Sequence, residues 1–357
     1  MKSSNGRALS FKNFIESFKG LSQKQIPQST EKDAPSISSL NGSKLAITDS
    51  KYIGTPDRFR FHTAFQSYCH HGSTPLVTSL MDLADSSSSV SLLPRRRLYG
   101  NPFETLSIKS GDDSMIISPN LVGVADGVSG YSGSHSDSGL FARSLLENIS
   151  RYLTELSVKS SRNLSLITDG EFEKSLDSSF EDALKIMDLE NLKGSSTLLI
   201  AMIIDADLKI LNIGDSKIFI IRNKEIVYSN QEQYISKLCP EQIGTNNFSK
   251  FPSTIVKIDT FKLKEEDLIL IASDGLTDNL YPDEILEFLN SNLNDQKNNL
   301  QKVINKLLYK TKSIAFDSYC VTPYVEKINE LNKEFITGGK LDDISVSLSK
   351  VSINYRN

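Results

Sequence analysis

The chain has 357 residues, of which 38% are hydrophobic and 24% charged, a composition typical of a globular protein with a substantial core. The net charge of -4 argues against a general nucleic-acid binder, and no apolar run approaches the ~20 residues that span a bilayer. Three scattered cysteines and only four histidines leave carboxylates as the side chains that could bind a metal.

Residues 1–57 are predicted to precede the folded domain as a presequence followed by a disordered linker. The first thirty residues carry five basic side chains and one acidic side chain. An apolar stripe at helical spacing is formed by Phe11, Phe14, Ile15 and Phe18. A basic, serine-rich, amphipathic start is typical of a mitochondrial presequence, and a disordered tail with one short helix is the alternative. The folded domain is then predicted to span residues 58–352.

Strands and helices alternate through the rest of the chain. Alternating residues at 59–65 predict a first strand, whereas residues 69–97 lack apolar periodicity and are interpreted as mostly exposed loop. Apolar stripes predict helices over residues 138–157, 171–187, 282–293 and 300–315. Runs rich in Ile, Leu and Val predict strands over residues 121–125, 197–204, 208–213, 217–221, 225–228, 255–261, 268–273 and 344–351. The four strands between residues 197 and 228 are expected to form one antiparallel meander, and the whole pattern indicates an α+β fold.

Four aspartates stand at the ends or edges of predicted strands: Asp113, Asp126, Asp274 and Asp342. Two of them follow a strand and precede a glycine, which lets the backbone turn and leaves its carbonyl near whatever the carboxylate binds. Carboxylates that converge without Lys or Arg partners repel each other, and Mg²⁺ or Mn²⁺ would relieve that repulsion. One Asp-Gly pair alone is more commonly a simple turn, so the metal interpretation depends on the ordered set.

Six blocks of sequence occur in a fixed order. They are Gly111-Asp112-Asp113, residues 122–130, Gly194-Ser195-Ser196-Thr197, residues 212–216, residues 270–278 and residues 339–346. In this order they resemble the metal-dependent protein phosphatase 2C family, and the resemblance covers residues 58–352. The second block, with Tyr131 after it, resembles the mitochondrial branch of that family.

The resemblance implies a β-sandwich of two antiparallel sheets flanked by helix pairs, with two or more Mg²⁺ or Mn²⁺ ions at one end. Asp126 would bridge two metals, and the carbonyl of Gly127 would bind one of them. Asp274 and Asp342 would bind the first metal. Asp113 would hold metal-bound water or bind a metal directly.

The resemblance also implies hydrolysis of phosphoserine and phosphothreonine by a water activated between two metals. Asp126, Asp274 and Asp342 would be the catalytic residues, phosphorylated proteins the substrates, and the active chain a monomer. Asp278 matches a ligand of a weaker third metal, although Leu192 and Lys193 stand where the family has another aspartate for that metal. Residues 214–216 are interpreted as a structural turn.

Two departures from the family pattern affect the expected chemistry. Val128 stands where many members have a histidine proposed as the general acid, so the proton would come from metal-bound water or from His135. Lys109 is the nearest basic residue where many members have an arginine for the substrate phosphate. An alternative is therefore a catalytically impaired phosphatase fold that binds or regulates. A haloacid-dehalogenase-like phosphatase is disfavoured, because Ala272 replaces the nucleophilic aspartate of that class.

The basic N-terminal segment and the resemblance to the mitochondrial branch together predict a location in the mitochondrial matrix. The mature N-terminus is expected between Lys19 and Asp57. A cytoplasmic protein that keeps its N-terminal tail is the alternative.

Overall fold

The computed structural model describes residues 59–70, 75–80, 105–128, 135–159, 167–245, 250–293, 299–333 and 335–353. These residues all belong to one compact unit of the chain. The predicted presequence and linker lie outside the described residues, and so do Tyr131 and residues 129–130 of the second sequence block.

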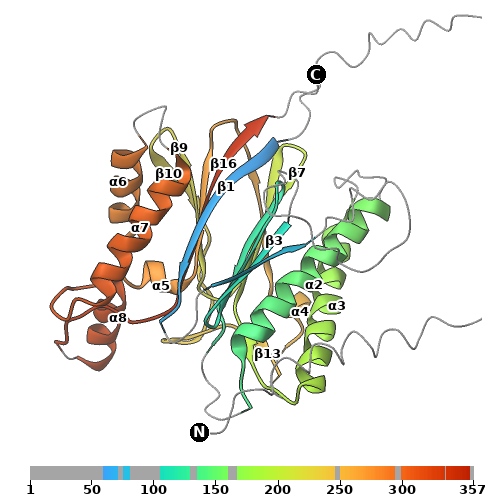
Figure 1. Ribbon diagram of the computed structural model, residues 1–357, viewed down its shortest axis with the longest axis horizontal. Helices are drawn as coiled ribbons and strands as arrows, with labels where there is room; N and C mark the ends of the chain where they lie inside the picture. Colours follow the sequence, from blue (N-terminus) through green and yellow to red (C-terminus); the bar gives the residue numbers. More distant parts are fainter. Residues whose placement is uncertain are drawn as a thin grey trace, which may run out of the picture. The chain divides into compact units, whose positions relative to one another are not determined.

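Two large antiparallel sheets form the centre of this unit (Figure 1). One has the order β14 (Lys257–Lys262), β8 (Asp207–Ile213), β7 (Leu198–Ile204), β5 (Leu121–Ala125), β4 (Asp113–Ile117), β3 (Thr105–Ser110) and β2 (Leu76–Leu80). The other has the order β1 (Phe59–Tyr68), β16 (Ile344–Ile353), β15 (Leu268–Ala272), β9 (Lys217–Arg222) and β10 (Glu225–Ser229). Two short pairs join β11 (Tyr234–Ser236) to β12 (Cys239–Pro240) and β6 (Ser195–Ser196) to β13 (Ile243–Gly244).

A helix pair covers the outer face of each large sheet (Figure 1). The pair on the seven-stranded sheet is α2 (Ser138–Lys159) and α3 (Asp169–Leu189), and the pair on the five-stranded sheet is α6 (Pro282–Asn292) and α7 (Leu300–Ala315). The remaining described helices are α4 (Pro252–Ile255), α5 (Asp274–Thr277) and α8 (Pro323–Asn332). None of the helices in the described ranges is long and apolar enough to cross a membrane.

Strand periodicity explains this layering. On β15, Ile269 and Ile271 belong to the cluster between the two sheets, whereas Leu270 belongs to the cluster under α6 and α7. Successive side chains on a strand point to opposite faces, so a strand buried on both faces reads as a continuous apolar run. The predicted α+β sandwich of two antiparallel sheets with flanking helix pairs is confirmed.

The predicted single meander between residues 197 and 228 is wrong. β7 and β8 pair in the seven-stranded sheet, whereas β9 and β10 pair in the five-stranded sheet. Gly214, whose φ is 103°, lies in the crossing between the sheets and takes a backbone conformation that favours glycine. A buried strand has the same composition in either sheet, and its sequence therefore does not reveal the crossing.

Two other elements depart from the sequence interpretation. β2 lies inside residues 69–97, which were expected to be mostly loop. Among the described residues it is an edge strand whose one partner is β3, and Leu76 and Val77 are exposed, so no buried alternation marks it. The strand expected at residues 255–261 begins at Lys257, because Pro252–Ile255 forms the short helix α4 with proline in its first turn.

Candidate metal centre

The β4–β5 hairpin brings the first two predicted site residues together. Ser114 lies opposite Ala125 in this hairpin. Asp113 at the start of β4 therefore lies beside Asp126, which directly follows β5. This register explains why two acidic positions thirteen residues apart reach the same end of the sandwich.

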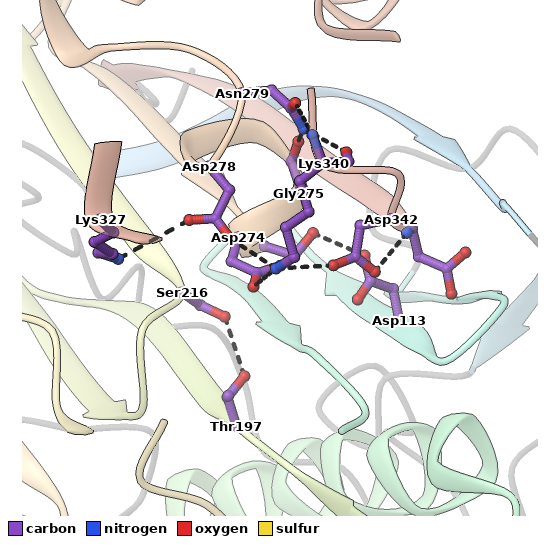
Figure 2. A network of polar contacts seen from close by, with 12 residues as sticks. Asp113, Thr197, Ser216, Asp274, Gly275, Asp278, Asn279, Lys327, Lys340 and Asp342 are labelled. Carbon is purple, nitrogen blue, oxygen red and sulfur yellow. Dashed lines mark hydrogen bonds and ion pairs between the residues drawn. The ribbon is translucent and has the colours of Figure 1, made fainter. Parts of the chain in front are cut away.

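Thr197 fixes the backbone at Asp126. The N–H of Asp126 donates to the Thr197 hydroxyl at 3.1 Å, and the carbonyl of Asp126 accepts from the Thr197 N–H at 2.9 Å. The Thr197 hydroxyl also lies 3.1 Å from that of Ser216, as Figure 2 shows. The Gly-Ser-Ser-Thr block therefore positions Asp126 through its backbone and not through its carboxylate.

Asp113 is almost completely buried, with 1% of its surface exposed. Its Oδ2 accepts a hydrogen bond of 2.7 Å from the Ser273 hydroxyl, which in turn accepts from the Ser345 N–H at 3.0 Å. Burial, and then the charge of Asp343, raise the pKa of Asp113 well above its usual value.

The five-stranded sheet contributes three more carboxylates at this end. Asp274 follows β15 and begins α5, Asp278 is the C-cap residue of α5, and Asp342 precedes β16, which pairs directly with β15. Figure 2 shows these carboxylates gathered around the side chain of Lys340. The predicted carboxylate ligands thus meet at one end of the sandwich, some contributed by one sheet and some by the other.

The β8–β9 crossing adds a carboxylate that sequence reasoning interpreted as structural. Asp215 is 7% exposed, and its Oδ1 accepts no hydrogen bond within the described part of the chain. Burial, followed by the charges of Asp274 and Asp278, raises the pKa of Asp215 to about 8. We use the term acidic cluster for Asp113, Asp126, Asp215, Asp274, Asp278 and Asp342.

Among the described residues, one ammonium group lies within 3.0 Å of carboxylates of the acidic cluster. Lys340 Nζ is 2.5 Å from Asp274 Oδ2, 2.6 Å from Asp278 Oδ2 and 3.0 Å from Asp342 Oδ2. The expectation that the carboxylates converge without a basic partner is therefore wrong. Lys340 stands in an irregular segment before β16, where no periodic pattern indicates the direction of a side chain.

Negative charge still exceeds positive charge in the cluster. Burial, followed by the charge of Asp274, raises the pKa of Asp126, Asp278 and Asp342, and the pKa of Asp278 reaches about 7. Burial also acts on Asp274, but the Lys340 ammonium, together with hydrogen bonds from Asp126 and Asp278, outweighs it and lowers the pKa of that carboxyl. The Lys340 ammonium also favours the ionised forms of Asp278 and Asp342, but there burial and neighbouring negative charge outweigh it, so the cluster is left short of positive charge.

The donor set of the cluster fits hard divalent cations. Its carboxylates are the oxygen ligands that Mg²⁺ and Mn²⁺ prefer, and the Asp215 oxygen that lacks a hydrogen bond is available to accept one from a bound group. As they stand, no three acidic, histidine or cysteine side chains of the described residues are arranged to hold an ion. Lys340 lies among three of the carboxylates, and some rearrangement would accompany metal binding.

A model of the family described as protein phosphatase 2C matches residues 114–309, more than half of the chain. The chain belongs to the protein phosphatase 2C family. It is 26% identical to "Protein phosphatase 2C homolog 7, mitochondrial" of Saccharomyces cerevisiae, over 81% of this chain and 89% of that protein. It is 28% identical to "Protein phosphatase PTC7 homolog fig" of Drosophila mojavensis, over 68% of this chain and 78% of that protein.

A solved structure shares the fold. The X-ray structure of the photosystem II phosphatase PBCP aligns with a TM-score of 0.57 at 19% identity, over 82% of this chain and 99% of that one. This likeness supports the sandwich architecture, and the two curated relatives carry the name protein phosphatase.

Two residues were considered in place of the family's arginine and histidine, namely Lys109 and His135. The first is engaged elsewhere and the second is exposed. Lys109 forms an ion pair of 3.0 Å with Asp137, whose carboxylate also accepts the Leu140 N–H at the start of α2. His135 is exposed, and its carbonyl accepts the Lys193 N–H. Lys109 thus helps to position a helix start.

Asp343 has a structural role that sequence reasoning missed. Its two carboxylate oxygens accept the backbone N–H groups of His70 and Asp112, each at 2.7 Å. A Cβ at Gly111 would overlap this carboxylate, so Asp343 and the left-handed turn at Gly111 pack tightly together. The Asp-Asp pair at 342–343 was the available signal, but sequence alone does not distinguish a ligand from a support.

Glycine is required at two positions beside the cluster because backbone approaches closely. A Cβ at Gly127 would overlap the Asp112 carbonyl oxygen, and one at Gly275 would overlap the Asp343 carbonyl oxygen. Each overlap is with backbone, which cannot move aside as a flexible side chain would. These glycines therefore hold the loops of the site against one another.

The raised pKa values predict a pH dependence for the metal-free chain. Asp278 and Asp215 have pKa values of about 7 and about 8 in the folded chain, against 3.8 for a free side chain. Between about pH 4 and pH 8 the folded chain therefore binds more protons than the unfolded chain, and the free energy of unfolding falls as pH rises. We expect a loss of a few kcal/mol between pH 5 and pH 8.

Urea denaturation of the chelated chain at several pH values measures this dependence. Added Mn²⁺ should flatten it, because a cation favours the ionised carboxylates. A free energy of unfolding that is flat or rises between pH 5 and pH 8 without metal would contradict the charge imbalance.

Proposed function

We propose that this member of the phosphatase 2C family is a protein serine/threonine phosphatase that depends on Mg²⁺ or Mn²⁺. Family membership supports phosphatase chemistry. The observation that carries the metal dependence is the acidic cluster, in which Asp113, Asp215 and Asp278 are buried. One closely placed ammonium, that of Lys340, is shared by Asp274, Asp278 and Asp342. A buried excess of negative charge costs folding free energy, and a protein retains it where cations bind.

Asp126, Asp274 and Asp342 are the proposed catalytic ligands, together with the carbonyl of Gly127. Asp113 and Asp278 complete the proposed metal-binding set. Two or more bound ions would supply a nucleophile activated near neutral pH and positive charge for the phosphoryl oxygens.

The chain itself supplies the placement of these ligands. Hydrogen bonds to Thr197 hold the backbone of Asp126, and the Ser273 hydroxyl orients the carboxylate of Asp113. The acidic cluster repels a phosphorylated substrate until cations compensate its charge, so metal binding would precede substrate binding. Phosphorylated proteins are the proposed substrates of a monomeric enzyme.

A catalytically impaired protein that binds or regulates is the second candidate. It is favoured by Lys340, which lies among the proposed ligands, and by Lys109, which is paired with Asp137. Both features reduce the positive charge available to a substrate phosphate.

Phosphate release from mixed phosphopeptides separates the two candidates. The proposal expects release from phosphoserine and phosphothreonine peptides with Mn²⁺ or Mg²⁺, a loss of about 100-fold or more in excess chelator, and recovery when the ion is restored. Phosphotyrosine peptides serve as the specificity control. Equal release in chelator would contradict the metal mechanism, and no release with either ion would favour the impaired protein.

We also propose that residues 1–57 direct the chain to the mitochondrial matrix and that residues 58–352 form the catalytic domain. The basic amphipathic start supports this location, and a relative in Saccharomyces cerevisiae is named mitochondrial. Terminal sequencing of the protein from cells should find a mature N-terminus between Lys19 and Asp57. An intact Met1 on a cytoplasmic pool, with none in mitochondria, would support the alternative.

A further inference from the structure

We propose that the ammonium of Lys340 is a resident cation of the acidic cluster and occupies a position that a divalent ion would otherwise take. This inference rests on the proposed function, because it concerns the same cluster. The native chain would then bind fewer metal ions than its carboxylates could hold without Lys340.

The contacts of Lys340 are those of a bound cation. Three oxygens from three different carboxylates lie within 3.0 Å of Nζ. They come from the first residue of α5, its C-cap and the segment before β16, so they meet at Nζ only in the folded chain. The Lys340 side chain is 20% exposed, and those of Asp274 and Asp278 are less exposed still.

The position of Lys340 is set by its surroundings and not by the carboxylates alone. Its backbone N–H donates to Asn279 Oδ1, and its carbonyl accepts from Asn279 Nδ2, both at 2.9 Å. The same Nδ2 donates to the Gly275 carbonyl at 2.9 Å, which ties Lys340 to α5. Lys340 Nζ also lies 5.2 Å from the centre of the Tyr324 ring. Figure 2 shows Asn279 and Gly275 beside Lys340.

Lys327 carries a second ammonium near this part of the cluster, and it is differently placed. Its Nζ is 3.9 Å from Asp278 Oδ1 and donates to the Tyr234 hydroxyl at 2.7 Å. Because Tyr234 and Glu232 already hold this ammonium, we expect it to stay there when Lys340 is neutralised. Removing the charge of Lys340 leaves a position lined by Asp274, Asp278 and Asp342, which a divalent cation is suited to fill.

Counting bound Mn²⁺ by equilibrium dialysis tests the proposal without an activity assay. At saturation the Lys340→Gln variant should bind one more Mn²⁺ per chain than the native chain. Lys340→Arg keeps the positive charge and should bind the native number. Lys209→Gln is the matched control, because Lys209 has a similarly buried side chain and an ion pair of 2.6 Å with Asp169, on the outer side of the other sheet.

Thermal unfolding gives a second measurement. In chelator, Lys340→Gln should melt about 10 °C below the native chain, because buried carboxylates lose their partner. Mn²⁺ should restore most of that difference, whereas the smaller loss in Lys209→Gln should not respond to Mn²⁺. A loss in Lys340→Gln that Mn²⁺ leaves unchanged would indicate a merely structural lysine and would overturn the proposal.

A double variant covers the case in which Lys340→Gln does not fold. Lys340→Gln with Asp278→Asn removes one charge of each sign, should fold, and should bind the native number of ions, because the new position has lost a ligand. A double variant that folds and binds one more ion than the native chain would overturn the proposal.

The outcomes distinguish this inference from the proposed function. Equal Mn²⁺ counts in the native chain and in folded Lys340→Gln overturn the inference, whatever the number. A native chain that binds no Mn²⁺, beside a Lys340→Gln variant that binds one, supports the inference and contradicts the metal-dependent function. One or more ions in the native chain and one more in the variant support both.

Discussion

Replacing Asp126 with asparagine is expected to reduce phosphate release by on the order of 10³-fold and to make the metal-free chain more stable. Loss of a group that supports charge stabilisation in the transition state typically costs about 10²–10³-fold in kcat. The burial of Asp126 and the charge of Asp274 raise its pKa, so its ionised form is unfavourable without metal. A neutral amide of the same shape removes that repulsion, and we expect a gain of about 1 kcal/mol.

The backbone hydrogen bonds of Asp126 to Thr197 remain in this variant, so the local fold should be retained. Asp267→Asn is the matched control. Asp267 has a completely buried side chain, and its two oxygens accept from Arg222 at 2.7 Å each. It directly precedes β15, at the end of that strand opposite to the cluster. This control should lose about 3 kcal/mol and keep its kcat. If Asp126→Asn also lost stability and kept its kcat, the assignment of Asp126 as a metal ligand would be contradicted.

Replacing Asp343 with alanine is expected to destabilise the chain by about 3 kcal/mol, the second large effect. The carboxylate accepts two backbone N–H groups, from His70 and Asp112, and hydrogen bonds to charged groups contribute about 1.5–3 kcal/mol each. Loss of negative charge near Asp113 offsets part of this cost, because the charge of Asp343 raises the pKa of Asp113.

The same change should raise the Mn²⁺ concentration needed for half-maximal activity by about 10-fold, since supports of metal ligands typically have effects of this size. Asp343→Asn removes the charge but keeps one acceptor. Its stability and its Mn²⁺ requirement should therefore lie between those of the alanine variant and those of the native chain. Urea denaturation and Mn²⁺ activation curves measure both effects. An alanine variant as stable as the native chain would show that Asp343 does not support the turn before Asp113.

The parts of the fold with a strong hydrophobic period could be predicted from the sequence. The four long helices bury one apolar stripe each, and strands such as β7 and β15 are buried on both faces, so the core itself determines their residue types. The edge strand β2 could not be predicted. Backbone pairing with β3 holds it in place, and the core does not determine its residue types because Leu76 and Val77 are exposed.

Two acidic positions of the candidate site, Asp126 and Asp274, could also be predicted from local sequence, since a strand followed by Asp-Gly places a carboxylate at a sheet end. The ordered sequence blocks indicated Asp113, Asp278 and Asp342. Asp215 was interpreted as part of a turn, because only the crossing between the sheets brings it to the cluster. Lys340 was missed because its role depends on which way one side chain points in an irregular segment. Such positions are set by tertiary contacts, here those of Asn279.

Anomalous scattering from crystals soaked in Mn²⁺ tests the central claim most directly. If the acidic cluster is a metal centre, anomalous peaks will lie among Asp126, Asp274 and Asp342, and the Lys340 ammonium will remain beside Asp278. A crystal at saturating Mn²⁺ with no anomalous peak within the cluster, and with Lys340 as its sole cation, would contradict the metal-dependent phosphatase proposed here.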